Sequence, residues 1–243
     1  MAEDLDSCIA QRHFEEAYGL LEKAKAYLKD AQSTPLLLEI RSKVNDRGRS
    51  LVDVLTKELE SSAEAKSLQG GGLRSARRVV KLLIQLNRSA QACQLYLRLC
   101  GAVSKARLKR VKREGATAAY AKQLGAIAFS NIVEITKEFL KIFSRSTNCT
   151  SGKSKTSRSE SSFLFIYHRF SLRNAGLVVW CSQEIKHLTT HLTKQLFVPQ
   201  VSLNTLVECV VCFRSHCDQV RRVLSEFVAT RCKERSQQLG SRF

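Results

Sequence analysis

Residues 77–97 read Arg-Arg-Val-Val-Lys-Leu-Leu-Ile-Gln-Leu-Asn-Arg-Ser-Ala-Gln-Ala-Cys-Gln-Leu-Tyr-Leu, and this stretch decides the fold. Apolar residues recur at helical spacing on both sides of Asn87-Arg88-Ser89. Asn ends a helix in the left-handed conformation at low cost, and Ser can accept hydrogen bonds from the free N–H groups of a following helix. The break therefore predicts two helices joined by a tight turn, which makes them antiparallel neighbours.

The composition favours helices throughout the chain. Its 243 residues are enough for one or two domains; 44% of them are hydrophobic and only two are Pro. Leu, Ala, Lys, Arg and Glu dominate, and all five are good helix formers. The predicted fold class is therefore all-α.

The residues before this hairpin predict further helices. Short helices are expected at 5–11 and 14–28. Thr34-Pro35 is a strong start signal, because Pro fits the first helical position and Thr can cap it. A long amphipathic helix is expected from there to residue 59, and the three glycines at 70–72 end this segment.

A strongly apolar segment follows the hairpin, between residues 120 and 143. Two apolar stripes run along it, so we expect a helix that is surrounded by other helices. Together with the preceding helices it is expected to form a bundle domain over 1–143. The stripes consist of Tyr120, Leu124, Ile127, Ile135, Phe139 and Ile142, and of Phe129, Ile132, Val133, Leu140 and Phe143.

Beyond this helix the composition changes. Eleven of the nineteen residues from Ser144 to Ser162 are Ser or Thr, four are basic, and the segment has no apolar periodicity. Such a segment cannot bury enough apolar surface to fold, so 144–162 is predicted to be an exposed, disordered linker. Residues 163–243 are then expected to form a second, smaller helical bundle. It would include a helix over 171–197 that buries Trp180 and Leu188.

The last segment carries apolar residues at alternating spacings of three and four, over about four heptads. This pattern predicts a helix-packing seam, which either closes the second bundle or docks to another protein. A dimeric coiled coil is the less favoured alternative, because the flanking positions carry no matched charges. The seam consists of Leu203, Leu206, Val210, Phe213, Cys217, Val220, Leu224 and Phe227.

The sequence shows no sign of secretion or membrane insertion. Its first residues are acidic and lead straight into a helix pattern. The longest apolar runs hold about five residues, whereas a spanning helix needs ~20. The nine cysteines, an odd number, are spread over helix patterns, which indicates reduced thiols. The chain is therefore expected to be cytoplasmic.

Candidate chemistry is sparse. Cys209 and Cys212, with His216, Cys217 and the pair His187 and His191, resemble the ligand set of a zinc site. Zinc-binding cysteine pairs usually lie on a turn, however, whereas these lie inside a helix pattern. No pair of carboxylates and no nucleophile with a base partner stands out. The sequence predicts no catalysis, no cofactor and no metal.

The formal net charge of +18 indicates attraction to something anionic. Six cations fall within nine residues at a helix end, where the helix dipole favours each by ~0.3–1 kcal/mol, so a solvated helix end is the plainer interpretation. As an interaction surface, each cation would contribute ~1 kcal/mol near an anionic membrane or would contact a partner. Nucleic acid is not expected, because no aromatic residues interleave the cluster. The cluster is Lys105, Arg107, Lys109, Arg110, Lys112 and Arg113.

Two stretches resemble a known family. They are Asp4-Leu-Asp-Ser-Cys-Ile-Ala-Gln-Arg-His-Phe-Glu-Glu-Ala-Tyr-Gly-Leu-Leu-Glu-Lys23 and Val79-x-x-Leu-Leu-Ile-x-Leu-Asn-Arg-Ser-x-x-Ala-x-x-Leu-Tyr-Leu97. Later landmarks follow in the family's order at 114–117, 178–180 and 209–217. Together they resemble the C-terminal helical region of the Exo-eighty-four family of exocyst subunits.

The resemblance implies an elongated stack of antiparallel helix bundles, a cullin-repeat-like rod of the tethering-complex kind. It implies a non-catalytic subunit of the exocyst, the complex that tethers secretory vesicles to the plasma membrane. The subunit is then expected to associate peripherally with the vesicle membrane and with the plasma membrane. Other exocyst subunits are the implied partners. Family members also carry a coiled coil and a pleckstrin-homology domain that binds the Ral GTPase; this chain shows neither, so Ral binding is not expected. A basic helical adaptor that binds anionic membrane or nucleic acid directly is the alternative function.

Overall fold

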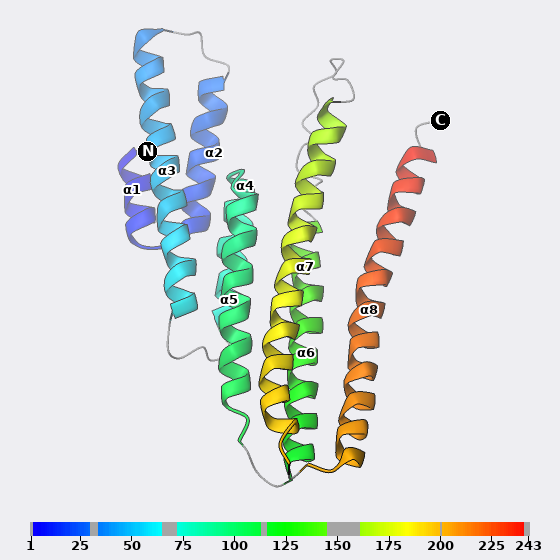
Figure 1. Ribbon diagram of the computed structural model, residues 1–243. Helices are drawn as coiled ribbons and strands as arrows, with labels where there is room; N and C mark the ends of the chain where they lie inside the picture. Colours follow the sequence, from blue (N-terminus) through cyan, green and yellow to red (C-terminus); the bar gives the residue numbers. More distant parts are fainter. Residues whose placement is uncertain are drawn as a thin grey trace. The chain divides into compact units, whose positions relative to one another are not determined.

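The computed structural model describes residues 2–29, 34–64, 72–112, 116–144, 161–199 and 201–240, with side chains within 3–29, 34–63, 73–112, 116–143, 175–199 and 201–226. These residues form eight α-helices and no strand, which confirms the all-α prediction (Figure 1). The predicted linker lies outside the described residues except at its two ends. The helices are α1 (Ala2–Ala10), α2 (Phe14–Lys29), α3 (Pro35–Glu64), α4 (Gly72–Gln85), α5 (Ser89–Lys109), α6 (Thr117–Ser144), α7 (Ser161–Leu196) and α8 (Leu203–Gly240).

The chain divides into two compact units. The first unit comprises Met1–Ala102 with Ser146–Arg173, and the second comprises Val103–Arg145 with Asn174–Phe243. This division differs from the predicted boundary after residue 143, because α6 belongs with α7 and α8 rather than with α1 to α4. A helix that is apolar on most sides can complete either of two bundles, and periodicity alone does not say which.

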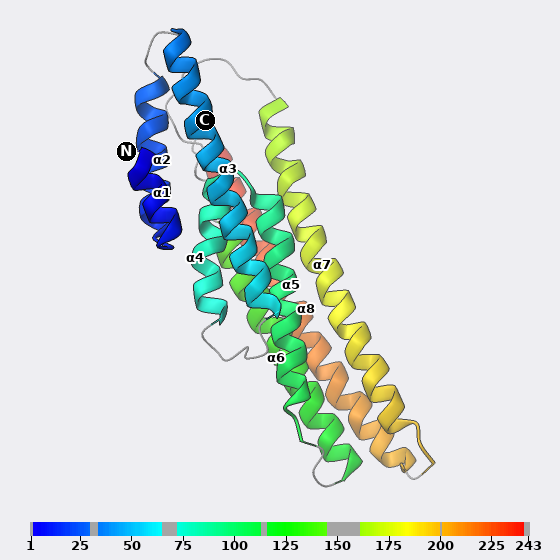
Figure 2. The same ribbon diagram turned by 90° about the vertical axis from the view of Figure 1, so that its left-hand side faces the viewer.

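In the first unit, α1, α2 and α3 pack together, and α4 packs on α2 and α3 (Figures 1 and 2). Their short connections make neighbouring helices antiparallel. Burying one aliphatic side chain contributes about 1.5–3 kcal/mol, so this apolar core stabilises the unit. Its most buried members are Ala17, Leu21, Leu51, Leu55, Leu59, Ala76, Val80, Leu83, Ala92, Tyr96, Leu99 and Cys100.

The turn between α4 and α5 has the predicted geometry. Asn87 has a φ of 63°, which is the left-handed conformation. Its N–H donates to the Ile84 carbonyl at 3.1 Å, and the Arg88 N–H donates to the Leu83 carbonyl at 2.8 Å. These two bonds satisfy carbonyls that the end of α4 would otherwise leave free. Because α5 begins directly at Ser89, the two helices are antiparallel neighbours, as predicted.

We expect Asn87→Ala to lower the free energy of unfolding by about 1 kcal/mol, because Ala tolerates the left-handed conformation poorly. Asn87→Gly is the matched variant, and it should cost clearly less since Gly adopts this conformation readily. Urea unfolding followed by circular dichroism measures both changes. Equal losses in the two variants would show that the left-handed conformation does not govern the turn.

The turn between α1 and α2 repeats this geometry with neither Gly nor Asn. Arg12 has a φ of 62°. Its N–H donates to the Ile9 carbonyl at 3.2 Å, and the His13 N–H donates to the Cys8 carbonyl at 2.9 Å. A left-handed residue with a side chain costs about 1–2 kcal/mol. Arg12 offsets part of this cost through an ion pair of 2.9 Å between its Nη1 and Oε2 of Glu58 in α3.

Polar contacts set the start of α3 and its position against α1. Pro35 is the first residue of α3, as predicted, and the Thr34 hydroxyl accepts a hydrogen bond from the Leu37 N–H at 3.4 Å. Arg47 of α3 donates to both carboxylate oxygens of Asp6 in α1, with Nε–Oδ1 at 3.0 Å and Nη2–Oδ2 at 2.9 Å. This two-point contact fixes the register of the short helix on the long one.

In the second unit, α6 is the central helix, as predicted. Its Tyr120 hydroxyl lies 3.4 Å from Nε2 of His191 in α7, and its Thr136 hydroxyl lies 3.8 Å from Sγ of Cys181 in α7. The last residues of α5 and the helix α8 are its other neighbours. Chain direction alternates from α5 to α8, so α6 and α8 run parallel (Figures 1 and 2). The buried members of its predicted stripes are Tyr120, Leu124, Phe129, Ile132, Val133, Ile135, Phe139, Leu140, Ile142 and Phe143, with Ile127 half-buried.

A carboxyl group is buried in this unit at Glu184 of α7. Burial raises the pKa of Glu184 above its ordinary value of 4.5, although a hydrogen bond from Ser104 and the charges of Lys105 and His187 act in the opposite direction. The folded state therefore holds this proton more tightly than the unfolded state. The resulting stabilisation is fully present below about pH 4.5 and is lost as the pH rises through the folded-state pKa. Above the folded-state pKa, the buried and ionised carboxylate is destabilising.

We expect Glu184→Gln to raise the free energy of unfolding at neutral pH, because the amide keeps the shape of the side chain without its buried charge. The gain should shrink toward zero below pH 4.5, where the carboxyl of the native chain is also neutral. Urea unfolding at acidic and at neutral pH measures the difference. A gain of the same size at both pH values would contradict this account.

Candidate interaction surface

The helix α8 packs on α6 through contacts at matching positions along the two parallel helices. The ring of Phe213 covers Gly125, where an added Cβ would lie 2.8 Å from the ring carbon Cδ1. The ring of His216 stacks on that of Phe129, with centroids 5.5 Å apart and planes inclined by 17°. The absence of a side chain at position 125 therefore lets an aromatic ring lie directly on the backbone of α6.

An exposed ion pair continues these contacts toward the start of α8. Nζ of Lys122 in α6 donates to Oε2 of Glu208 in α8 at 2.6 Å. This hydrogen bond raises the pKa of Lys122 and lowers that of Glu208, so both groups are charged at neutral pH. The pair fixes the register of the two helices more than it stabilises them, because solvent screens it.

The face of α8 that packs inward differs from the predicted seam by about one residue. Val220 is buried, as predicted, and so is Cys209, which the predicted seam does not include. Three predicted members are exposed: Leu203 at 74%, Val210 at 64%, and Cys217. The residues from 209 to 213 are Cys-Val-Val-Cys-Phe, so spacing does not decide which of them faces inward. Of the other members, Leu206, Phe213 and Leu224 are half-buried, and the side chain of Phe227 lies outside the described residues.

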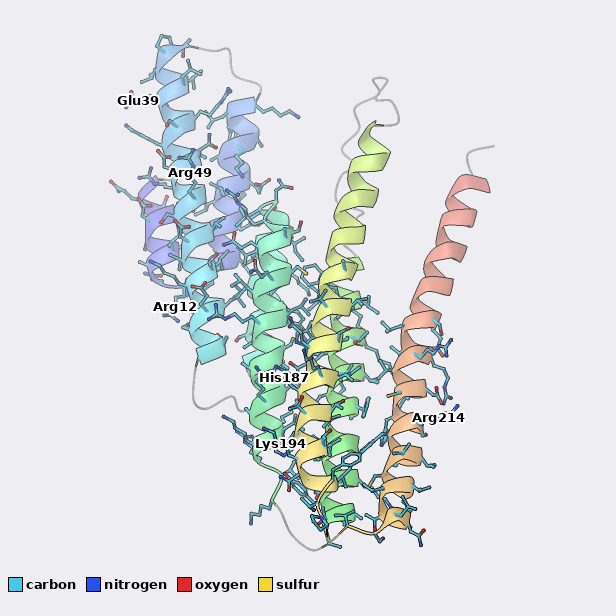
Figure 3. The ribbon with its side chains drawn as sticks, viewed as in Figure 1. Arg12, Glu39, Arg49, His187, Lys194 and Arg214 are labelled. Atoms are coloured by element: carbon cyan, nitrogen blue, oxygen red, sulfur yellow. The ribbon has the colours of Figure 1, made fainter. Side chains whose placement is uncertain are left out.

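This rotation leaves an apolar surface exposed on α8. Val207, Val210 and Val211 are 55%, 64% and 63% exposed, and Arg214 follows on the same side. Figure 3 shows Arg214 on the side of α8 away from α6. We call these four residues the outer face of α8. The sequence pattern missed Val207 and Val211, because the heptad positions assigned to the seam do not include them.

Two members of the predicted basic cluster are engaged within the second unit. Lys105 lies near the carboxylate of Glu184. Nη1 of Arg107 donates to Oδ1 of Asn131 at 2.6 Å and to Oε2 of Glu134 at 3.3 Å. Arg107 therefore connects the end of α5 to α6, and Lys105 lies close enough to Glu184 of α7 for its charge to act on that carboxylate, which a count of charges along the sequence does not reveal.

The rest of the cluster lies at the end of α5. Lys109, Arg110 and Lys112 are exposed, and Arg113 lies outside the described residues. The part of the cluster that is available to an anionic surface is therefore smaller than the six cations of the prediction.

Cys209, Cys212 and His216 of α8 pack as side chains of the bundle. Sγ of Cys212 lies 3.6 Å from Nε2 of His216, and Cys209 is buried. Burial raises the pKa of the Cys209 thiol, which disfavours the thiolate that a metal requires. Among the residues that the structure describes, no three His, Cys, Asp or Glu side chains are grouped so that they could hold a metal ion.

The described helices contain no stretch that is both long and apolar enough to cross a lipid bilayer.

Comparison with known proteins places these helices in a family. The family model described as exocyst component 84 C-terminal matches residues 1–161. Exocyst complex component 8 of Xenopus laevis is 34% identical over 223 residues, which are 92% of this chain and 28% of that protein. Exocyst complex component 8 of Homo sapiens is 34% identical over 221 residues, which are 90% of this chain and 27% of that protein.

A more distant relative shows similar coverage. Exocyst complex component EXO84 of Cryptococcus neoformans is 23% identical over 209 residues, or 86% of this chain and 26% of that protein. The similarity to the relatives continues past residue 161 into α7 and α8, since the alignments cover about nine-tenths of the chain. The chain spans just over a quarter of the length of these relatives.

Proposed function

We propose, from the premise that the chain belongs to the exocyst component 84 C-terminal family, that it acts as a non-catalytic part of the exocyst. In this role it would help the complex to tether secretory vesicles to the plasma membrane. The observation that carries the proposal is the 34% identity to proteins named as exocyst components over nine-tenths of the chain. The helical units support it, because amphipathic helices with exposed side faces suit assembly with other helices.

The outer face of α8 is the surface that we propose for contact with another exocyst subunit. Its three valines are each more than half exposed, and large apolar side chains gathered on one helix face are typical of protein interaction sites. Val207 is three residues from Val210 and four from Val211, so the three valines share one helix face that can pack against the apolar face of a partner helix. Such contacts would hold the chain in a cytoplasmic assembly that is peripheral on vesicles and plasma membrane.

Affinity purification of the tagged chain from cells, with mass spectrometry of the bound proteins, tests the proposal. We expect other exocyst subunits to copurify with the native chain and to be reduced in a variant with Val207→Ser, Val210→Ser and Val211→Ser. The matched control is Val178→Ser with Val179→Ser, which removes two exposed valines of α7 at 54% and 55% exposure. Recovery of no exocyst subunit would overturn the assignment, and equal losses in both variants would overturn the role of the outer face.

A further inference from the structure

The connection between α7 and α8 exposes large apolar side chains at a chain reversal. Phe197 is 73% exposed and Leu203 is 74% exposed, although they bracket a segment of only a few residues. Pro199 between them is exposed too. Chain reversals usually carry polar residues, and exposed apolar side chains grouped at one place mark a contact site. We call Phe197, Pro199 and Leu203 the apolar tip.

Three exposed cations lie at the same end of the second unit as the apolar tip. The chain runs toward this end in α5 and α7 and leaves it in α6 and α8 (Figures 1 and 2). Lys109 and Arg110 are exposed at the end of α5, and Lys194 is exposed in the last turn of α7, where Figure 3 shows it close to this end. Among the described residues, no carboxylate forms an ion pair with any of these three side chains.

Acidic groups are scarce around the tip. Among the described residues of 103–112, 116–125, 186–199 and 201–211, the only carboxylate is that of Glu208, and Glu114 of the α5–α6 connection lies outside the described residues. That carboxylate is already engaged by Lys122 at 2.6 Å. The described residues at this end of the unit therefore carry a net positive charge beside the exposed apolar side chains.

We propose that this end of the second unit binds an anionic lipid bilayer. Phe197 and Leu203 enter the boundary between headgroups and acyl chains, while Lys109, Arg110 and Lys194 lie at the level of the anionic headgroups. Apolar insertion and attraction to anionic lipid are the two signals that together give stable peripheral binding. The contact is peripheral, in keeping with the lack of a spanning stretch among the described helices. It does not depend on assembly into the exocyst, which the outer face of α8 is proposed to support.

A bilayer fits this surface better than RNA or a protein groove. The tip carries one aromatic ring, whereas binding to single-stranded RNA relies on several aromatic residues interleaved with cations. The apolar residues project from a turn rather than lining a groove, which suits insertion into a fluid surface. Lysines with long, flexible stems can follow headgroups that have no fixed positions.

Flotation of the full 243-residue chain with vesicles tests the proposal. We expect binding to vesicles of phosphatidylcholine with about 30 mol% phosphatidylserine, and little binding to phosphatidylcholine alone. Phe197→Ser with Leu203→Ser should weaken the vesicle partition coefficient by roughly tenfold or more. Lys109→Ala, Arg110→Ala and Lys194→Ala should each weaken it roughly fivefold, and raising the salt from about 0.1 M to about 0.5 M should do the same.

Two control variants keep the test specific. Val178→Ser with Val179→Ser removes exposed apolar residues elsewhere in α7, and Arg221→Ala with Arg222→Ala removes exposed cations of α8; neither should change vesicle binding. Equal binding to neutral vesicles, or equal losses in the control variants, would overturn the proposal. Tight binding of single-stranded RNA combined with no effect of the Phe197 and Leu203 changes would overturn it in favour of nucleic acid.

Fluorescence gives a second measurement that does not depend on affinity. The chain has one Trp, Trp180, which is buried. In Phe197→Trp, vesicles with brominated acyl chains should quench the added Trp, whereas the native chain should show no quenching. If Phe197→Trp binds the vesicles but its added Trp is not quenched, the apolar tip does not enter the bilayer. The outer-face variant of α8 should bind vesicles as the native chain does, which separates this proposal from the exocyst contact.

Discussion

Phe139→Ala is expected to lower the free energy of unfolding by about 3–5 kcal/mol, a large part of the stability of a small helical unit. Phe139 lies in the last two turns of α6 and is 1% exposed. Its ring stacks on that of Phe143, with centroids 4.4 Å apart and planes inclined by 29°. Truncation removes the buried ring and leaves a cavity that helices on several sides of α6 cannot close without moving.

The matched control for this substitution is Phe197→Ala. Phe197 is 73% exposed, so its truncation should change the free energy of unfolding by no more than about 0.5 kcal/mol. Urea unfolding followed by circular dichroism compares the two variants. Small and equal changes in both would mean that α6 is not the centre of a packed unit.

Gly125→Leu is the second change with a large expected effect, a loss of about 3 kcal/mol. An added Cβ at this position meets the ring of Phe213, so the ring must leave α6 before any larger side chain can fit. The loss should appear although Leu has the higher helix propensity, by somewhat under 1 kcal/mol relative to Gly. Limited proteolysis should then cut α8 faster than in the native chain, because α8 has lost the packing of Phe213 on α6.

Two further variants separate overpacking from a general effect of the substitution. Gly19→Leu in α2 places the side chain where no atom lies within 4 Å of the new Cβ, so the helix propensity should raise stability slightly. Phe213→Ala combined with Gly125→Leu should recover part of the loss, because the ring that clashes is gone. If Gly19→Leu cost as much as Gly125→Leu, the close approach of Phe213 would not be the cause.

The two tight turns show which turns can be predicted from local sequence and which cannot. The turn at Asn87 can be predicted from the residue type, because few residues other than Gly and Asn adopt the left-handed conformation readily. Arg12 adopts the same conformation with the same pair of hydrogen bonds, yet its residue type gives no signal. An ion pair to Glu58, a residue of α3 that is distant in the sequence, compensates there. Local rules therefore find a turn only when the turn is stable by itself.

The basic cluster shows the same limit for charged residues. From the sequence, Lys105, Arg107, Lys109 and Arg110 are equivalent cations on one short stretch. The fold brings Asn131, Glu134 and Glu184 against the first two and leaves the other two exposed near the apolar tip. Charge complementarity depends on which helix faces which, and that is a property of packing.

The sequence by itself determined the helices, most of their ends, the hairpin at Asn87 and the burial of α6, because each depends on residues three or four positions apart on one helix. Only the tertiary structure decided which bundle α6 completes, which residues of α8 face inward, and which apolar side chains stay exposed. Gly125 opposite Phe213 shows the reason. The rotation of α8 is set by where a ring on one helix finds room on another, and no spacing along a single chain segment contains that information.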